Sequence, residues 1–274
     1  MNYVMDRISF IVPTKNSDRT MESCLSSLRN QVYPDVEVIV VDNLSTDETL
    51  AISHKYADKV ETKGPERSAQ RNHGASVATG GIVVFIDSDM TLEPTIASDI
   101  AAAFAKDPSL GALIIPERSF GEGYFAQCRV LEKSLYVGND DVEAARVFTR
   151  EAWDRIGGWN EELTAAEDWD LADRTHAAGV KVGRVPSYIW HDEGHIELRN
   201  TFNKKRYYGQ WISAYLKSHG EVGTSKLRRT ALFDQPGKLV RDPVHATGMF
   251  VMKATEAAGL IAGMRDAKRA GASA

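Results

Sequence analysis

Three short runs of apolar, mostly β-branched residues restrict the fold of this chain more than any other sequence feature. They occupy residues 8–12, 36–41 and 82–86. The runs show little polar alternation, which is typical of parallel strands covered on both faces. Helical patterns lie between them at residues 19–31, 46–56 and 67–78. This order predicts an α/β fold, with a Rossmann-like, mostly parallel sheet flanked by helices and joined by right-handed crossovers.

Length and cysteine content narrow the class of protein. A chain of 274 residues suits one large domain, or one domain with an appendage. Further helical patterns at 95–106 and 168–178 accompany a strand pattern at 110–115. Two cysteines, Cys24 and Cys128, are too few for a disulfide scaffold. The N-terminus lacks the basic start and cleavage site of a secretory signal, so we expect a cytoplasmic location.

Charge is distributed unevenly along the chain. Residues 1–198 carry 19 basic and 33 acidic side chains, whereas residues 199–274 carry 14 basic and 5 acidic side chains. A basic C-terminal part suits phosphate-bearing partners, which are nucleic acid, a nucleotide diphosphate or anionic lipid head groups. A solvated basic face is the alternative interpretation.

The residues at the carboxyl ends of the three runs are the first candidates for a ligand site, because ligands of such sheets bind there. The polar or turn residues at these ends are Pro13, Thr14, Asn16, Asp42, Asp87, Ser88 and Asp89. The sequence contains no G-x-G-x-x-G turn and no G-x-x-x-x-G-K-[ST] loop. Their absence argues against dinucleotide-binding dehydrogenases and P-loop NTPases.

Two of these residues, Asp87 and Asp89, place carboxylates close together at the end of a predicted buried strand. Like charges at this spacing repel unless a cation joins them. Carboxylate oxygens suit Mn²⁺ or Mg²⁺ that is held jointly with a substrate diphosphate. The alternative is a strand-end turn with two exposed acids.

Six short blocks of the sequence carry a resemblance to a known family, and they lie at residues 8–16, 38–49, 71–74, 85–89, 157–161 and 167–171. These blocks resemble the family 2 glycosyltransferases of the GT-A fold, and the resemblance extends from residue 8 to about residue 195. It implies a catalytic domain at 1–198, with a nucleotide-binding half at about 1–115 and an acceptor-binding half at about 116–198. A basic, helical C-terminal extension follows at 199–274.

The resemblance also implies roles for individual residues. Asp42 accepts a hydrogen bond from the base, Arg71 approaches the base or diphosphate, and Asp87 approaches the ribose or metal. The implied nucleotide pocket consists of Pro13, Thr14, Asn16, Asp42, Arg71, Asp87 and Ser88. One departure concerns Asn43 and Leu44, which stand where family members commonly have a second acid and a glycine. Asp42 is retained, but the identity of the base is left open.

Catalytic and metal-binding roles follow from the same resemblance. The Glu167-Asp168 pair resembles the catalytic acids of the family, with Asp168 as the base. The resemblance also implies that Asp89 binds the cation and that His191 completes its site. The alternatives are a surface-loop histidine for His191 and a helix-dipole role for the acids. Asp170 and Asp173 continue the acidic run, so only the family position selects Asp168 as the base.

The implied activity is inverting, metal-dependent transfer of a sugar from a nucleotide diphosphate donor to a hydroxyl of a glycan or lipid-linked acceptor. A UDP-sugar is favoured, with GDP and dTDP kept open. One alternative is a nucleotide-sugar-binding assembly protein without turnover. A sugar-phosphate nucleotidyltransferase is less favoured, because its glycine-rich basic turn after the first strand is missing.

The C-terminal part contains a basic, aromatic stretch at 204–211 and a helical pattern at 244–264 that begins after Asp242 and Pro243. Lys253 and Glu256 within that pattern argue against a transmembrane span. A membrane-interfacial helix and a helix packed on a partner subunit both remain open. Inward packing is expected for part of the stripe formed by Tyr208, Trp211 and Tyr215. No nucleic acid is expected as a partner, and the sequence does not give the oligomeric state.

Overall fold

The computed structural model describes residues 7–139, 142–226 and 235–271, and the chain divides into two compact units. Unit 1 comprises Met1–Glu117, Glu143–Glu161 and Asp168–Asp192. Unit 2 comprises Arg118–Val142, Glu162–Glu167 and Glu193–Ala274. The functional boundaries expected from the sequence, at about 115 and at 198, stay a prediction.

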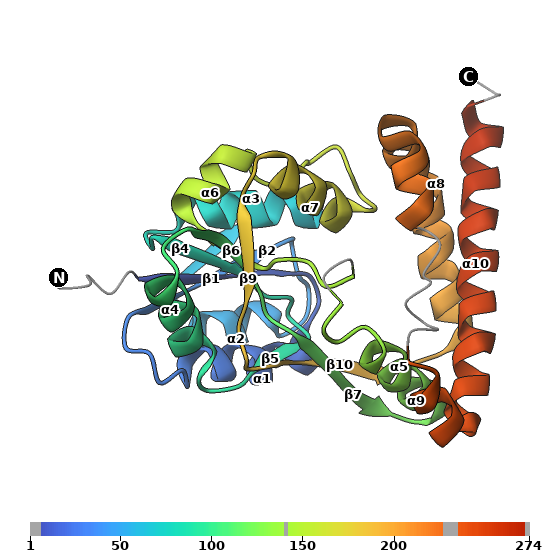
Figure 1. Cartoon of the computed structure of the whole chain (residues 1–274), viewed down its shortest axis with the longest axis horizontal. Coiled ribbons are helices and arrows are strands. Elements are labelled where there is room, and N and C mark those ends of the chain that lie inside the picture. The colour runs from blue at the N-terminus through green and yellow to red at the C-terminus, as the bar shows by residue number, and fades with distance from the viewer. Residues whose placement is uncertain (1–6, 140–141, 227–234, 272–274) are drawn as a thin grey trace. The chain divides into compact units, whose positions relative to one another are not determined.

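A seven-stranded sheet forms the centre of unit 1 (Figure 1). Its order is β3-β2-β1-β4-β8-β6-β9. The pairings of β1 with β2 and β4, of β2 with β3 and of β6 with β9 are parallel, whereas β8 is antiparallel to both β4 and β6. The expected mostly parallel α/β sheet is therefore confirmed. The strands are β1 (Ile8–Thr14), β2 (Val36–Asp42), β3 (Lys59–Thr62), β4 (Ile82–Phe85), β6 (Leu110–Ile114), β8 (Val147–Thr149) and β9 (Lys181–Arg184).

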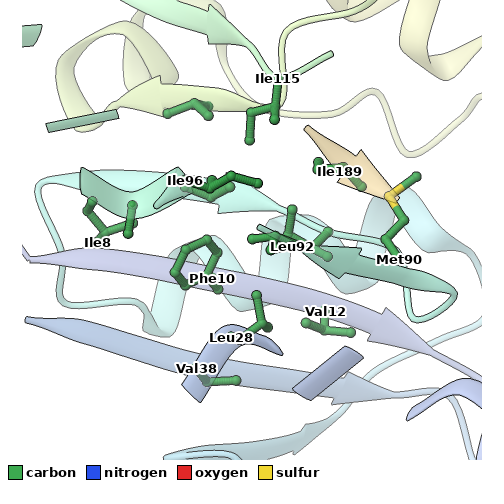
Figure 2. Close-up of a cluster of buried hydrophobic side chains, with 14 of the residues drawn as sticks. Ile8, Phe10, Val12, Leu28, Val38, Met90, Leu92, Ile96, Ile115 and Ile189 are labelled. Atoms are coloured by element: carbon green, nitrogen blue, oxygen red, sulfur yellow. The ribbon is translucent and has the colours of Figure 1, made fainter. Parts of the chain in front are cut away.

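Helices cover both faces of this sheet (Figure 1). One face carries α1 (Asp18–Arg29), α2 (Thr49–Tyr56) and α4 (Ile96–Lys106); the other carries α3 (Arg67–Val77), α6 (Arg150–Ile156) and α7 (Glu167–Ala177). Because side chains of a strand alternate between faces, Phe10 enters the first core and Ile11 the second. Figure 2 shows Phe10 between Leu28 of α1 and Ile96 of α4. The absence of polar alternation in the sequence follows from this two-sided burial.

Several short elements carry no clear signal in the sequence. The strand β3 follows α2, and a three-stranded sheet has the order β5-β10-β7. Its strands are β5 (Met90–Leu92), β7 (Glu117–Glu122) and β10 (Ile189–His195). The antiparallel register of β10 on β5 pairs His191 with Met90, directly after Asp89. This pairing brings His191 next to Asp89, although the two are far apart in the sequence.

The helices of unit 2 are α5 (Tyr124–Ser134), α8 (Leu198–Lys226), α9 (Pro236–Arg241) and α10 (Pro243–Gly271). A small core of unit 2 includes Cys128 of α5 and Met249 and Met252 of α10. The predicted helical character of the C-terminal part is confirmed, and α10 continues beyond the expected end at residue 264. None of the helices in the described part of the chain has the length and apolar character needed to span a bilayer.

The aromatic stripe on α8 packs inward only in part, which agrees with the expectation. Trp211 is 45% exposed and Tyr208 is half-buried, whereas Ile212 is buried. Tyr215 lies outside the described side chains. Small residues make the contact with α10, because a Cβ on Gly263 would lie 2.0 Å from the carbonyl oxygen of Arg206.

Candidate active site

The loops after β1 and β2 hold each other through polar contacts. Asp42, at the end of β2, is 1% exposed, and its carboxylate accepts hydrogen bonds from the backbone nitrogen and the hydroxyl of Ser45. Asn16, after β1, donates from its backbone nitrogen to Ser45 Oγ across 2.8 Å and accepts from the backbone nitrogen of Thr46. Asn16 and Leu44 both have positive φ, of 49° and 54°. Leu44 thus adopts the left-handed conformation that a glycine would take at lower cost.

A buried glutamine that sequence reasoning missed ties these two strands to α3. Gln70 donates from Nε2 to the carbonyl oxygens of Thr14 and Val41, across 2.9 and 2.6 Å. The hydroxyl of Thr14 is buried and has no hydrogen-bond partner among the described residues. Pro13 is buried within β1 and pairs with Val41 in the strand register. The available polar group at the end of β1 is therefore the Thr14 hydroxyl.

Arg71, one turn into α3, is a central cation of the site. Its side chain is 2% exposed, and Nη2 donates to Asp87 Oδ1 across 2.7 Å. Its other terminal nitrogen, Nη1, lies 3.8 Å from Asp168 Oδ1, and the guanidinium stacks 4.4 Å from the centroid of the Trp159 ring. The Arg71 side chain therefore joins Asp87, at the end of β4, to Asp168, at the start of α7.

Asp87 is held by a second arginine that the sequence did not single out. Arg146 Nη1 lies 3.3 Å from Asp87 Oδ2, while Nε and Nη2 of Arg146 both donate to Glu117 Oε1. Burial alone would raise the pKa of Asp87, but the guanidiniums of Arg71 and Arg146 outweigh it and hold that pKa well below its ordinary value. Asp87 is therefore held in its charged form and binds both guanidiniums.

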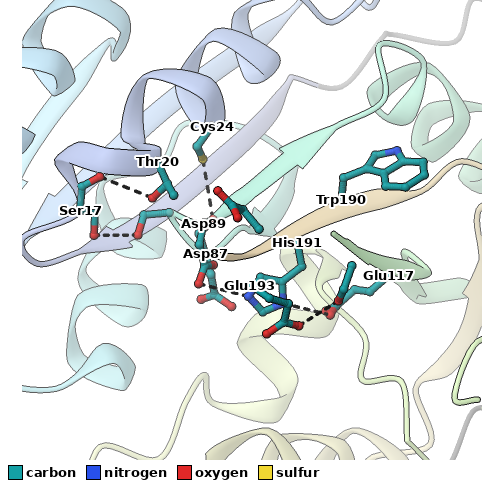
Figure 3. A network of polar contacts seen from close by, with 12 residues as sticks. Ser17, Thr20, Cys24, Asp87, Asp89, Glu117, Trp190, His191 and Glu193 are labelled. Atoms are coloured by element: carbon teal, nitrogen blue, oxygen red, sulfur yellow. Dashed lines mark hydrogen bonds and ion pairs between the residues drawn. The ribbon is translucent and has the colours of Figure 1, made fainter. Parts of the chain in front are cut away.

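Asp89, directly before β5, faces His191 of β10 (Figure 3). Asp89 Oδ2 lies 3.1 Å from His191 Nε2. The other carboxylate oxygen, Oδ1, is buried and has no hydrogen-bond partner among the described residues. A buried acceptor oxygen beside an imidazole nitrogen is a donor set that suits a divalent cation whose remaining ligands come from a diphosphate. The residues thus fit the expected metal, although no group of three or more His, Cys, Asp or Glu forms a metal-binding cluster in the described ranges.

Ser88 lies apart from these two carboxylates. Its hydroxyl donates to the hydroxyl of Ser17, just before α1, across 2.9 Å. The Cys24 thiol of α1 contacts the carbonyl oxygen of Asp87, and burial is the main cause of its raised pKa. We therefore find Ser88 directed at α1, a structural contact, while its predicted role in the nucleotide pocket stays a prediction.

The acids at the start of α7 differ in their surroundings. Glu167 is buried and belongs to unit 2, while the Asp168 side chain is 54% exposed. Asp170 is buried and bonded to Arg174, which in turn donates to the carbonyl oxygens of Ile156 and Gly158. Among these acids, Asp168 combines solvent access with proximity to Arg71.

Residues of the 71–74 block also position the segment that precedes α7. Asn72 donates to the carbonyl oxygen of Trp159 and accepts from its backbone nitrogen, across 2.9 and 2.8 Å. Gly74 allows α3 to approach the sheet, because a Cβ there would lie 2.4 Å from Ile11 Cγ2. The block therefore fixes both the Arg71 guanidinium and the Trp159 ring beneath it.

The structure thus brings together most of the predicted residues of unit 1. Arg71, Asp87 and Asp168 form one charged group, while Asp89 and His191 form a pair. The family described as Glycosyl transferase family 2 matches residues 9–151. The chain belongs to glycosyl transferase family 2. This family assignment agrees with the blocks identified in the sequence.

Curated relatives of this family 2 glycosyltransferase cover part of its chain. The poly(ribitol-phosphate) beta-N-acetylglucosaminyltransferase TarS of Staphylococcus aureus is 38% identical over 120 residues, which are 40% of this chain and 21% of TarS. Chondroitin synthase of Escherichia coli is 26% identical over 177 residues, 60% of this chain and 26% of the synthase. The chain therefore spans about a fifth to a quarter of the length of these relatives.

Solved structures extend the likeness of this family 2 chain to nearly its whole length. The mannosyltransferase PcManGT of Pyrobaculum calidifontis, in complex with GDP-Man and Mn²⁺, has a TM-score of 0.65 and 20% identity, covering 96% of this chain and 88% of that chain. TarS 1–349 in complex with UDP-GlcNAc has a TM-score of 0.56 and 20% identity, covering 91% of this chain and 81% of that chain. This likeness confirms the GT-A fold expected from the sequence.

Proposed function

We propose that this chain transfers a sugar, with inversion, from a nucleotide diphosphate donor to a hydroxyl of a glycan or lipid-linked acceptor. The observation that carries the proposal is the position of Arg71 between Asp87 and Asp168. Arg71 joins Asp87, at the carboxyl end of β4, to the exposed carboxylate of Asp168, which an acceptor would approach. Ligands of doubly wound sheets bind at such strand ends.

The donor nucleotide would bind over the ends of β1 and β2. Asp42, Asn16 and the unpartnered hydroxyl of Thr14 offer polar groups there. UDP is the first choice, because TarS 1–349 is similar in fold and its structure contains UDP-GlcNAc. PcManGT, solved with GDP-Man, keeps GDP as the second choice.

Asp89 and His191 would hold Mn²⁺ or Mg²⁺, as their facing oxygen and nitrogen atoms suggest. When bound, such a cation supplies positive charge that stabilises the departing diphosphate. Arg71 would contribute further positive charge near the same leaving group. Asp87, whose carboxylate is paired with two arginines, would orient those guanidiniums and approach the ribose.

Asp168 would be the general base. Its carboxylate takes the proton of the acceptor hydroxyl while the acceptor oxygen bonds to the anomeric carbon. The bond from that carbon to the diphosphate oxygen breaks on the opposite face, and the diphosphate leaves with the electron pair. Inversion follows from this single displacement, which needs no covalent intermediate on the protein. Glu167, which is buried, would support the start of α7 rather than touch the acceptor.

A thermal-shift panel tests the donor half of the proposal. UDP, GDP, dTDP and CMP are each added with and without Mn²⁺ or Mg²⁺, because a ligand of the native state raises Tm. We expect a metal-dependent rise with UDP that exceeds the rise with CMP. No rise with any nucleotide diphosphate would contradict donor binding. Binding without hydrolysis or transfer of the matching donor would instead favour a nucleotide-sugar-binding assembly protein.

We further propose that α10 lies on an anionic membrane surface, which would place the protein peripherally on the cytoplasmic face. Apolar residues of one helical face are solvent-exposed, with Val244 62%, Val251 45% and Ile261 48% exposed. Arg265 and Lys268 continue the same face toward the C-terminus. Apolar area next to basic residues is typical of interfacial helices.

Flotation of the full chain with vesicles tests this surface. We expect binding to vesicles that contain phosphatidylserine and loss of binding in the triple variant Val244→Ser, Val251→Ser and Ile261→Ser. A control variant, Glu151→Gln on the exposed side of α6, should bind as the parent does. Equal flotation of triple variant and parent would contradict the proposal. Concentration-dependent dimers that the triple variant abolishes, without vesicle binding, would assign the face to a second copy.

A further inference from the structure

Arg146 and Glu117 lie within unit 1. In the proposed transfer Arg146 appears only as a partner of Asp87, and Glu117 has no role. Each side chain is 19% exposed. Arg146 comes just before β8, and Glu117 begins β7. The sequence did not single out either residue, because each is one charged residue among many. They differ from the other charged residues in their contacts, which reach Asp87 on one side and His191 on the other.

The contacts of the Glu117 carboxylate divide between its two oxygens. Oε1 accepts both hydrogen bonds from Arg146, including one of 2.9 Å from Nε. Oε2 lies 4.0 Å from His191 Nδ1 (Figure 3). Two donors from one guanidinium hold Oε1 in place, and Oε2 is the oxygen that lies on the side of His191. Glu117 therefore presents a negative oxygen to the imidazole nitrogen opposite Asp89.

The remaining guanidinium nitrogen of Arg146 completes the connection. Nη1 lies 3.3 Å from Asp87 Oδ2. Burial alone would lower the pKa of Arg146, but the carboxylates of Glu117 and Asp87 raise it instead. The result is a continuous chain of polar contacts from Asp87 through Arg146 and Glu117 to His191.

We propose that Glu117 and Arg146 are positioning residues of the diphosphate-binding site. Arg146 holds the Glu117 carboxylate, and Glu117 holds the His191 imidazole with Nε2 directed at Asp89. This inference rests on the proposed function, since it concerns the same cation site. Carboxylates that face the distal nitrogen of a ligand histidine fix its tautomer and orientation, and their loss commonly weakens metal binding.

A stabilising role alone would not require this arrangement. Buried ion pairs often contribute little net stability, because desolvation offsets their attraction. The neighbouring pair of Arg184 with Glu143, at 2.6 Å, offers a matched comparison in the same unit. The Glu143 side chain is 9% exposed, and its contacts include Arg184 and the Glu117 backbone nitrogen. Substitution of Glu143 thus removes a similar buried pair without removing the carboxylate that faces His191.

The test is the affinity for Mn²⁺ in the presence of UDP, measured from the electron paramagnetic resonance signal of free Mn²⁺. Glu117→Gln keeps the shape of the side chain but removes its charge, and we expect about 10–100-fold weaker Mn²⁺ binding. Arg146→Lys keeps the charge but loses the planar fork, so it should weaken binding in the same direction. Glu143→Gln should stay within about twofold of the parent. Unchanged affinity in Glu117→Gln, or equal loss in Glu143→Gln, would overturn the inference.

A measurement on the metal-free protein separates this inference from the proposed function. The Nδ1 resonance of His191 in ¹H–¹⁵N spectra can be assigned by its disappearance in His191→Asn. It should shift in Glu117→Gln but not in Glu143→Gln. A parent protein that binds neither UDP nor Mn²⁺ while the resonance shifts as described would contradict the proposed function and leave the positioning role standing. An unchanged resonance would overturn the positioning role.

Discussion

Arg71 Nη2 donates to Asp87 Oδ1 across 2.7 Å, and this ion pair is the contact on which the rest of the charged site is built. The arginine comes from α3 and the aspartate follows β4, so the pair fixes a helix on one face of the sheet to a strand end. Trp159 covers the guanidinium, which leaves Nη1 directed toward Asp168. Substrate charge would therefore meet a preorganised array rather than mobile side chains.

Loss of Arg71 should destabilise unit 1. Arg71→Met removes one partner of a buried pair and leaves Asp87 with Arg146 alone, so we expect the free energy of unfolding to fall by about 3 kcal/mol. Urea denaturation measures this change. Asp87→Asn combined with Arg71→Met should cost less than the sum of the two single variants. Additive costs would show that the two side chains do not interact energetically.

Asp168 should be needed for turnover but not for donor binding. Asp168→Asn keeps the size of the side chain and removes the proton acceptor, so kcat should fall by about 10²–10⁴-fold. The Tm rise caused by UDP and Mn²⁺ should stay within about 1 °C of the parent's rise, because the donor binds at other residues. Asp173→Asn, on the same helix, is the control and should retain parental kcat. Near-parental turnover in Asp168→Asn would place the base elsewhere.

Asp89 should be needed for metal-dependent binding. Asp89→Ala removes the buried oxygen Oδ1 and the partner of His191, so the additional Tm rise that Mn²⁺ gives to UDP should disappear. The smaller rise with UDP alone should persist, since Asp42 and Thr14 are intact. Asp192→Ala, which loses a surface pair with Arg19, provides the control. An unchanged metal effect in Asp89→Ala would remove that residue from the cation site.

The sequence predicts the parts of the fold whose signal is local. The runs that became β1, β2 and β4 are mostly apolar because both faces of the sheet are covered, and the residues after them form the site. Arg146 and Glu117 escaped prediction, since their importance arises from the pairing of strands that are distant in sequence. Leu44 shows the reverse case: its departure from the family pattern was visible, but its positive φ was not. The strand β7 was missed because three of its six residues are charged and three are exposed, so it contains no apolar run.

The close contact between α8 and α10 should depend on glycine. A Cβ on Gly263 would lie 2.0 Å from the Arg206 carbonyl oxygen, which is backbone and cannot rotate away. Gly263→Ala should therefore lower the free energy of unfolding of unit 2 by about 1–3 kcal/mol. Gly237→Ala in α9 is the matched control, because no atom lies within 4 Å of its added Cβ. Thermal unfolding of both variants would test this contact, and equal Tm values would contradict it.

Acid should weaken the contact between α5 and α10 through Glu256. Arg129 of α5 donates to both Glu132 and Glu256, and Lys253 pairs with the same two carboxylates. Burial alone would raise the pKa of Glu256, but Arg129 and Lys253 lower it to about 2, from an ordinary value of 4.5. Because the folded pKa is depressed, the stabilisation is complete above pH 4.5 and is lost as the pH falls toward 2.

A titratable carboxylate at this position has a measurable signature. Glu256→Gln cannot gain a proton, so its free energy of unfolding should fall less steeply than the parent's between pH 4.5 and pH 3, measured by urea denaturation. At pH 7 the variant should be less stable by about 3 kcal/mol, since Arg129 and Lys253 lose a buried partner. Glu151→Gln, at an exposed helical pair, should follow the parent at every pH. Parallel pH profiles for Glu256→Gln and the parent would show that Glu256 is not the group whose protonation loosens α10. Glu132 would then be the next carboxylate to substitute, because Arg129 and Lys253 lower its pKa as well, against the effect of burial.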